Sequence, residues 1–170
     1  MTARDLPPLE RLLAIEECTR LMTEYGRRID HGRAVSVAEL FTEDGAWRSP
    51  TIDAVGRDRL RAFFARRDAL TDRVTRHVVT NIAVDVLDAD HARGVSVAVE
   101  LRGDRDDRDV DGLATDTRPA IVGDYEDEFV RVDGRWLFRE RRVVVAFKRE
   151  SEVFMPAAPD GTPHRHPEEP

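Results

Sequence analysis

The chain has 170 residues, enough for one domain with a hydrophobic core and too few for two domains of ordinary size. Its formal net charge is −7 and its pI is near 5.3, so we expect neither nucleic acid nor a membrane surface as a partner. A single cysteine, Cys18, rules out an internal disulfide, and no apolar run has the length of a signal peptide core or membrane span. These features predict a cytoplasmic protein.

The first predicted element is a helix over residues 9–31. Apolar residues recur there at three- and four-residue spacing and form one stripe, made of Ile15, Cys18, Met22, Tyr25 and Ile29. Cys18 lies in the middle of this stripe, so we interpret it as a buried and unreactive thiol.

Two more helices are predicted before residue 75, where the pattern becomes that of strands. Residues 35–45 indicate a short helix that ends at Gly45, followed by an extended segment ahead of Pro50. Residues 56–70 form a third amphipathic pattern, in which Leu60, Phe63 and Phe64 should face the core.

From residue 75 onward the pattern is typical of strands. Four alternating or β-branched runs follow one another, at residues 76–88, 91–102, 120–133 and 135–147. Residues 88–91 join the first two runs by a tight turn, and Asp133–Gly134 is a strong hairpin signal between the last two. Three helices followed by an antiparallel meander predict an α+β fold in one domain over residues 1–155. The Pro-rich tail, residues 156–170, should be flexible.

The connection over residues 103–119 is long and acidic. Asp107, Asp109, Asp111 and Gly112 match the first half of a calcium-binding loop, but Arg118 stands where a bidentate glutamate is required. A solvated acidic loop is therefore the favoured interpretation, and we predict no metal site.

The sequence contains none of the common motifs for cofactor binding or nucleophilic catalysis, so acid–base chemistry without a cofactor is the enzymology left open. His77, at the start of a predicted strand, is the most interesting histidine, although packed or half-exposed histidines are common there. Strict alternation would place it on the face opposite the apolar residues Val78, Ile82, Val84 and Val86. A bulge or a pocket lined by the mixed face is needed to bring His77 inside.

Asp30 is unusual for its position. The stretch "EYGRRIDHGR", residues 24–33, ends the first helix, and Asp30 lies in its last turn. The negative end of the helix macrodipole disfavours a carboxylate there by roughly 0.3–1 kcal/mol. Such a position is a poor choice for a purely structural acid.

Three segments carry a resemblance to a known family: "LMTEYGRRIDHGRAVSVAELFTEDGAWRSP" (21–50), "RHVVTNIAVDV" (76–86) and "YEDEFVRVDGRWLFRERRV" (125–143). Over residues 10–150 the chain resembles the SnoaL-like branch of the nuclear transport factor 2 (NTF2)-like superfamily, which includes scytalone dehydratase and hexachlorocyclohexane dehydrochlorinase. The resemblance implies a cone, in which a curved antiparallel sheet wraps the long helix and the interior holds the active site. The longer 103–119 connection and the lack of a second pocket histidine are departures from these enzymes.

The resemblance also assigns roles to particular residues. It implies that Asp30 and His77 form a dyad that acts as a general base. A carboxylate that accepts a hydrogen bond from one imidazole nitrogen fixes the tautomer and makes the other nitrogen a better base. Substrate-binding roles are implied for Tyr25, Trp47, Tyr125 and Arg141. Core packing is an equal alternative for Trp47 and Tyr125, and a solvated strand charge is the simpler interpretation of Arg141.

Three functions remain open at this point. The first is a cofactor-independent lyase or isomerase that takes a proton from a small hydrophobic molecule, such as an aromatic, polyketide-like or halogenated compound. The second is a non-catalytic domain that binds a hydrophobic ligand in the cone. The third is an assembly module like the small subunits of ring-hydroxylating dioxygenases. A homo-oligomer, dimer or trimer, is also expected, because valines on the predicted strands exceed what three helices can cover.

Overall fold

The computed structural model of the protein describes residues 6–105 and 118–150. The acidic segment 107–112 and the tail 156–170 lie outside the described residues. The helical elements are α1 (Pro8–Asp30), the 3-10 helix η2 (Ala34–Leu40) and α2 (Arg57–Asp68). The strands are β1 (Phe41–Ser49), β2 (Ile52–Val55), β3 (Arg73–Val86), β4 (His91–Asp104), β5 (Pro119–Val132) and β6 (Arg135–Lys148).

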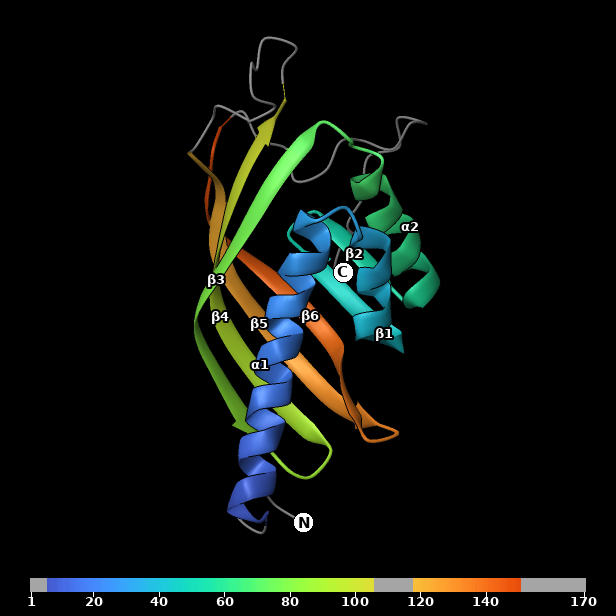
Figure 1. The fold of residues 1–170 in the computed structure, drawn as a ribbon, viewed down its shortest axis with the longest axis vertical. Coiled ribbons are helices and arrows are strands. Elements are labelled where there is room, and N and C mark those ends of the chain that lie inside the picture. Colours follow the sequence, from blue (N-terminus) through green and yellow to red (C-terminus); the bar gives the residue numbers. More distant parts are fainter. Residues whose placement is uncertain (1–5, 106–117, 151–170) are drawn as a thin grey trace, which may run out of the picture.

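The strands form one curved sheet, which α1 crosses along its concave side (Figure 1). The strand order is β2-β1-β6-β5-β4-β3, and every neighbouring pair is antiparallel except β1 with β6. The helices η2 and α2 lie beside the upper half of α1 (Figure 1). The α+β cone predicted from the sequence is therefore confirmed, with one parallel pairing that the meander pattern did not predict.

The core fills the space between α1 and the sheet. The predicted stripe of α1 faces inward, and Cys18 and Met22 are fully buried. Burial raises the pKa of the Cys18 thiol to about 12, which keeps it protonated and unreactive, as predicted. In α2, Leu60 and Phe64 are buried as expected, while Phe63 is partly buried against the same core.

The predicted helix over residues 35–45 is only half correct. The helical part ends at Leu40, and β1 begins at Phe41. Phe41 pairs with Phe138 of β6, and their rings stack with centroids 5.0 Å apart. Gly45 lies in the irregular part of this ladder, where an added Cβ would come within 2.9 Å of the Cβ of Phe41. Residues 41–45 are therefore a strand and not a helix, because they pair with β6, which lies far away in the sequence.

A bulge in β3 turns His77 toward the interior. The register between β3 and β4 shifts between Thr80 and Ala83, and Asn81 has a φ of +52°. Because of this shift, the inward face changes from odd-numbered to even-numbered residues along the strand. Val78 is therefore 49% exposed, and the predicted single face with Ile82, Val84 and Val86 was wrong.

Candidate active site

Asp30 and His77 meet in the interior of the cone. Nδ1 of His77 lies 2.7 Å from Oδ1 of Asp30, although 47 positions separate the two residues in the chain. The backbone N–H of His77 donates to Oδ2 of Asp30 at 2.8 Å. Only 6% of the His77 side chain and 7% of the Asp30 side chain are exposed. The carboxylate at the end of α1 is thus held on β3 by both the backbone N–H and the ring of His77.

This geometry fixes which imidazole nitrogen carries the proton. Burial tends to raise the pKa of Asp30, but hydrogen bonds from the ring and backbone of His77 and from Thr75 lower it below its ordinary value overall. An ionised carboxylate can only accept, so Nδ1 of His77 donates. Its Nε2 is then left with a free lone pair, which is the arrangement a general base requires.

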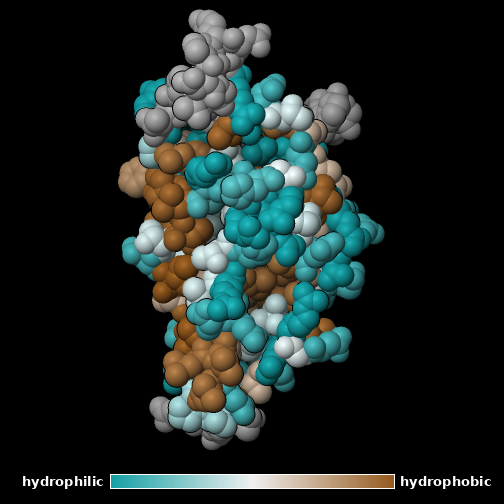
Figure 2. Space-filling view, viewed as in Figure 1, coloured by the Kyte–Doolittle hydropathy of each residue, from teal (hydrophilic) through white to brown (hydrophobic). Residues whose placement is uncertain are grey.

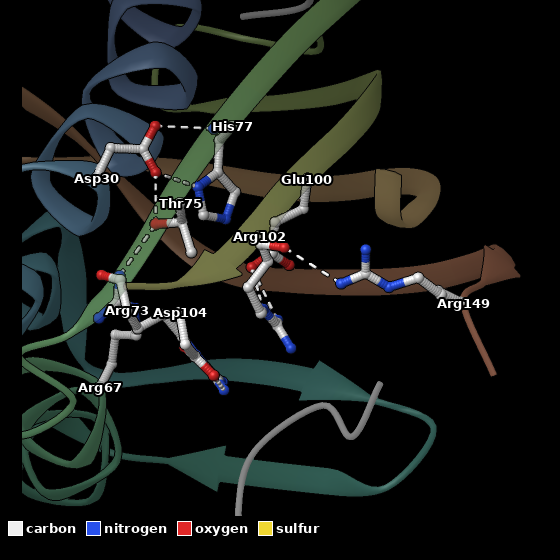
Figure 3. Close-up of polar contacts among 9 residues, drawn as sticks. All are labelled: Asp30, Arg67, Arg73, Thr75, His77, Glu100, Arg102, Asp104 and Arg149. Atoms are coloured by element: carbon white, nitrogen blue, oxygen red, sulfur yellow. Dashed lines mark hydrogen bonds and ion pairs between the residues drawn. The ribbon is translucent and has the colours of Figure 1, made fainter. Parts of the chain in front are cut away.

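Two neighbouring residues hold the carboxylate in place and were not singled out by the sequence. Oγ1 of Thr75, which is almost fully buried, donates to Oδ1 of Asp30 at 3.0 Å. The same hydroxyl accepts from Nη2 of Arg67 at 3.0 Å (Figure 3). Arg67 and Thr75 thus form a relay of hydrogen bonds that ends on Oδ1 of Asp30, the same oxygen that the imidazole contacts. Thr75 precedes His77 by two positions on an inward face, which is the only sequence signal that could have identified it.

Gly26 lets the helix approach the strand. A Cβ built on Gly26 would lie 2.9 Å from the Cβ of His77, closer than side chains normally come. A glycine inside a helix costs roughly 0.5–1 kcal/mol relative to alanine. Here the absence of a side chain one turn before Asp30 allows the Asp30–His77 contact to form.

The His77 ring lines a small cavity of about 50 Å³. Helix α1, β1 and the three strands β4, β5 and β6 supply the rest of the lining, which consists of Tyr25, Trp47, Ala98, Glu100, Ile121, Gly123, Tyr125 and Val143. Three of the four residues predicted to bind substrate, Tyr25, Trp47 and Tyr125, therefore line the same cavity as His77.

The aromatic residues present hydrogen-bond donors to this cavity. Nε1 of Trp47 donates to the hydroxyl of Tyr25 at 2.8 Å, which leaves the Tyr25 proton available to another acceptor. Tyr125 packs edge-on against Tyr25, with ring centroids 5.8 Å apart. Burial raises the pKa of both tyrosines well above 10, so each stays a neutral hydroxyl donor.

Arg141 lies behind the tyrosines and does not line the cavity. It is fully buried, so the interpretation as a solvated strand charge was wrong. Its Nε and Nη2 bind the two carboxylate oxygens of Asp127 at 2.8 and 2.7 Å. Its guanidinium carbon is 4.2 and 4.1 Å from the ring centroids of Tyr25 and Tyr125. Arg141 can therefore act on the cavity only through these rings.

Metal binding finds no support in the part of the chain that the structure describes. No group of three or more histidine, cysteine, aspartate or glutamate side chains is arranged there to hold an ion. The chemistry available to the described cavity is that of an imidazole, two phenols and a carboxylate.

Comparison with known proteins identifies the family. The profile of the SnoaL-like domain family matches residues 10–142, and the chain belongs to this family. None of the curated proteins is similar enough to count as a relative. The described helices include none that is both long and apolar enough to cross a membrane.

Solved structures show the same fold. A proposed scytalone dehydratase from Novosphingobium aromaticivorans is 26% identical, with a TM-score of 0.69 over 86% of this chain and 93% of its own. An NTF2-like protein with a cystatin-like fold from the same organism is also 26% identical, with a TM-score of 0.65 over 80% of this chain and 84% of its own. LinA, 20% identical with a TM-score of 0.69 over 87% of this chain and 97% of its own, supports the fold alone.

Proposed function

We propose that the protein is a cofactor-independent lyase or isomerase whose general base is the Asp30–His77 dyad. The 2.7 Å contact between two nearly buried side chains, beside a cavity, is the observation that carries the proposal. Structural ion pairs can be as short, but they do not require an imidazole that opens onto a cavity. The similar structure described as a proposed scytalone dehydratase supports the same class of chemistry.

In the proposed step, Nε2 of His77 removes a proton from a carbon atom of the substrate. The electron pair of that C–H bond either forms a new double bond while a neighbouring group departs, or is held as an enolate until the proton returns elsewhere. Asp30 balances the positive charge that the ring acquires, and it holds the ring in place without taking its proton. A positioned base of this kind contributes about 10²–10⁴-fold to the rate. The neutral hydroxyls of Tyr25 and Tyr125 can stabilise the negative charge on a substrate oxygen.

One observation favours a second candidate, a non-catalytic domain that binds a small ligand. The cavity, at about 50 Å³, is well below the roughly 300–1,000 Å³ of pockets for drug-sized ligands. A cavity of this size suits a single-ring molecule only if its lining side chains move apart. A binding domain would keep the cavity and gain nothing from the dyad, so the two candidates differ in what Asp30 and His77 contribute.

Proton exchange in D₂O separates these candidates without knowledge of the natural substrate. The protein would be incubated with small cyclic ketones, plain, hydroxylated and halogenated, and the loss of α-proton signals would be followed by NMR. We expect exchange above the buffer rate for at least one ketone, with a loss of about 10²-fold or more in Asp30→Asn and in His77→Ala. The exposed histidine His91, which also contacts an aspartate, provides the matched control His91→Ala. Full exchange rates in both dyad variants would end the assignment to an enzyme of this type.

We also propose that the protein forms a homo-oligomer. Exposed apolar side chains on the strands include Val78, Val95, Val144 and Phe147, and Phe147 is 72% exposed. A separate group, Leu9, Leu12 and Leu13, covers the start of α1, at the lower end of the molecule (Figure 2). Light scattering after gel filtration tests this proposal, with Phe147→Ser expected to lower the mass if the sheet forms the interface.

A further inference from the structure

The carboxylate of Glu100 lines the cavity beside His77. The two residues are direct partners in the antiparallel ladder between β3 and β4, so their side chains project from the same face of the sheet. Both line the cavity. Figure 3 shows Asp30 and Glu100 on opposite sides of the His77 ring. Nothing in the proposed proton abstraction uses Glu100, and only 15% of its side chain is exposed.

The hydrogen bonds of Glu100 are one-sided. Nε and Nη2 of Arg102 both donate to Oε1, at 3.0 and 2.8 Å. Among residues 6–105 and 118–150, no donor reaches Oε2. The carboxylate is therefore neutralised and anchored by Arg102 through one oxygen, while the second oxygen keeps its full capacity to accept.

We propose that Oε2 of Glu100 accepts a hydrogen bond from a hydroxyl group of the substrate, so that the substrate is an uncharged, hydroxylated molecule. An apolar or purely halogenated ligand that displaced water from the cavity would leave this oxygen unpaired, at a cost of about 1–3 kcal/mol or more for a charged group. A site built to bind a hydroxyl strongly rejects an analogue that lacks it.

The charges around Glu100 disfavour a charged ligand of either sign. An anionic ligand would meet Glu100 itself. An ammonium group would meet Arg102, which already pairs with Glu100, and Arg67 of α2 nearby; Arg73 beside them is itself paired with Asp104 (Figure 3). Burial, followed by the positive charges of Arg73 and Arg102, lowers the pKa of Arg67. A neutral hydroxyl gains the hydrogen bond without either repulsion.

This inference rests on the proposed function only in placing the substrate in this cavity. It adds an orientation, with the substrate hydroxyl on the β4 side of His77 and the phenols of Tyr25 and Tyr125 facing the ligand from α1 and β5. The cavity would then hold one acceptor, one base and two donors around a single small molecule. Among the substrates open to the family resemblance, it selects the hydroxylated ones over the halogenated ones.

Ligand binding tests the inference without any turnover. The probes are phenol, toluene, in which a methyl group replaces the hydroxyl, and benzoate, each titrated with the protein and followed by NMR. We expect Glu100→Met to weaken phenol binding about 10- to 100-fold, the range of a hydrogen bond to a charged group. Toluene binding should change less than twofold, and benzoate should bind the wild type weakest. Glu126→Gln, an exposed change on β5, is the control and should alter nothing.

Glu100→Met removes the carboxylate that Arg102 contacts at 2.8 Å, so the double variant Glu100→Met/Arg102→Met is measured beside the single one. Toluene binding reports that the cavity is intact in each. Equal weakening of phenol and toluene, or unchanged phenol binding in both variants, would overturn the inference. Failure of every probe to bind the wild type would overturn the inference, while proton exchange in D₂O would still decide the proposed function. In His77→Ala, the effect of Glu100 on phenol should persist, which separates this result from the fate of the dyad.

Discussion

Two acid–base pairs lie inside the cone, Asp30 with His77 and Asp127 with Arg141. Both contain a 2.7 Å contact between buried side chains. Asp30 and His77 lie 47 positions apart in the chain, whereas Asp127 and Arg141 are direct partners on the neighbouring strands β5 and β6. They differ in access. The His77 ring lines a cavity, whereas Arg141 and Asp127 are sealed behind Tyr25 and Tyr125.

The comparison shows that burial and a short distance do not by themselves indicate chemistry. Asp127 illustrates this, because burial raises its pKa while the bidentate contact with Arg141 opposes the rise, and the side chains of both residues are fully buried. In contrast, Asp30 has a lowered pKa and orients a ring that keeps one nitrogen free. We interpret the first pair as catalytic and the second as support for the tyrosine rings.

The strongest test of this distinction is to break the sealed pair. Arg141→Met leaves Asp127 buried without a partner, and we expect a loss of about 3–5 kcal/mol in the free energy of unfolding. The double variant Asp127→Leu/Arg141→Met should recover most of that loss, since a buried pair replaced by apolar groups is often neutral. Urea unfolding measures both. A loss below about 1 kcal/mol in the single variant would contradict the structural role.

A smaller effect is expected where α1 meets β3. Gly26→Ala places a Cβ within 2.9 Å of the Cβ of His77, so the strand must shift and the Asp30–His77 contact must lengthen. We expect the exchange rate to fall about 10-fold or more, because small misplacements of catalytic groups are costly. Thr23→Ala, on the exposed side of the same helix, controls for helix propensity. Unchanged exchange in Gly26→Ala would show that the close approach is not needed.

Removing the hydroxyl that supports Asp30 should have a still smaller effect. Thr75→Val deletes the 3.0 Å bond to Asp30 and leaves Nη2 of Arg67 without this acceptor. One hydrogen bond contributes about 0.5–1.5 kcal/mol to stability. We therefore expect the exchange rate to fall several-fold and the free energy of unfolding to fall by about 0.5–1.5 kcal/mol. Thr75→Ser keeps the hydroxyl and should restore most of both. If valine and serine behave alike, the hydroxyl does not orient the acid.

The smallest predicted effect is on the pH dependence of stability. The folded pKa of Asp30 is lowered, so its stabilising contribution is complete above the ordinary aspartate pKa of about 3.9. That contribution is lost as the pH falls through the lower folded value. The stability difference between wild type and Asp30→Asn should therefore shrink below about pH 4 in thermal unfolding. Asp124→Asn, at an exposed strand position, is the matched control. A difference that grows with acid would reverse the sign assigned to Asp30.

Much of this molecule could be predicted from its sequence. The apolar stripe of α1, the amphipathic α2 and the four long alternating strands are local patterns, and Asp133–Gly134 forms its hairpin with the positive φ angles that such a turn requires. The sequence also indicated a functional role for Asp30, because a carboxylate is disfavoured at a helix C-terminus. The resemblance to the SnoaL-like family then connected Asp30 with His77, Tyr25, Trp47 and Tyr125.

The remaining features depend on contacts between distant segments. Residues 41–45 became a strand because β6 offers a parallel edge, and the bulge at Asn81 turned His77 inward against the alternation of its own strand. Arg141 and Asp127 were indistinguishable from surface charges until the sheet curved around them. Periodicity records only how a segment divides its residues between two faces. Which face is covered, and by what, is set by the partner strands and helices, so tertiary structure alone decided where this chain buries its charges.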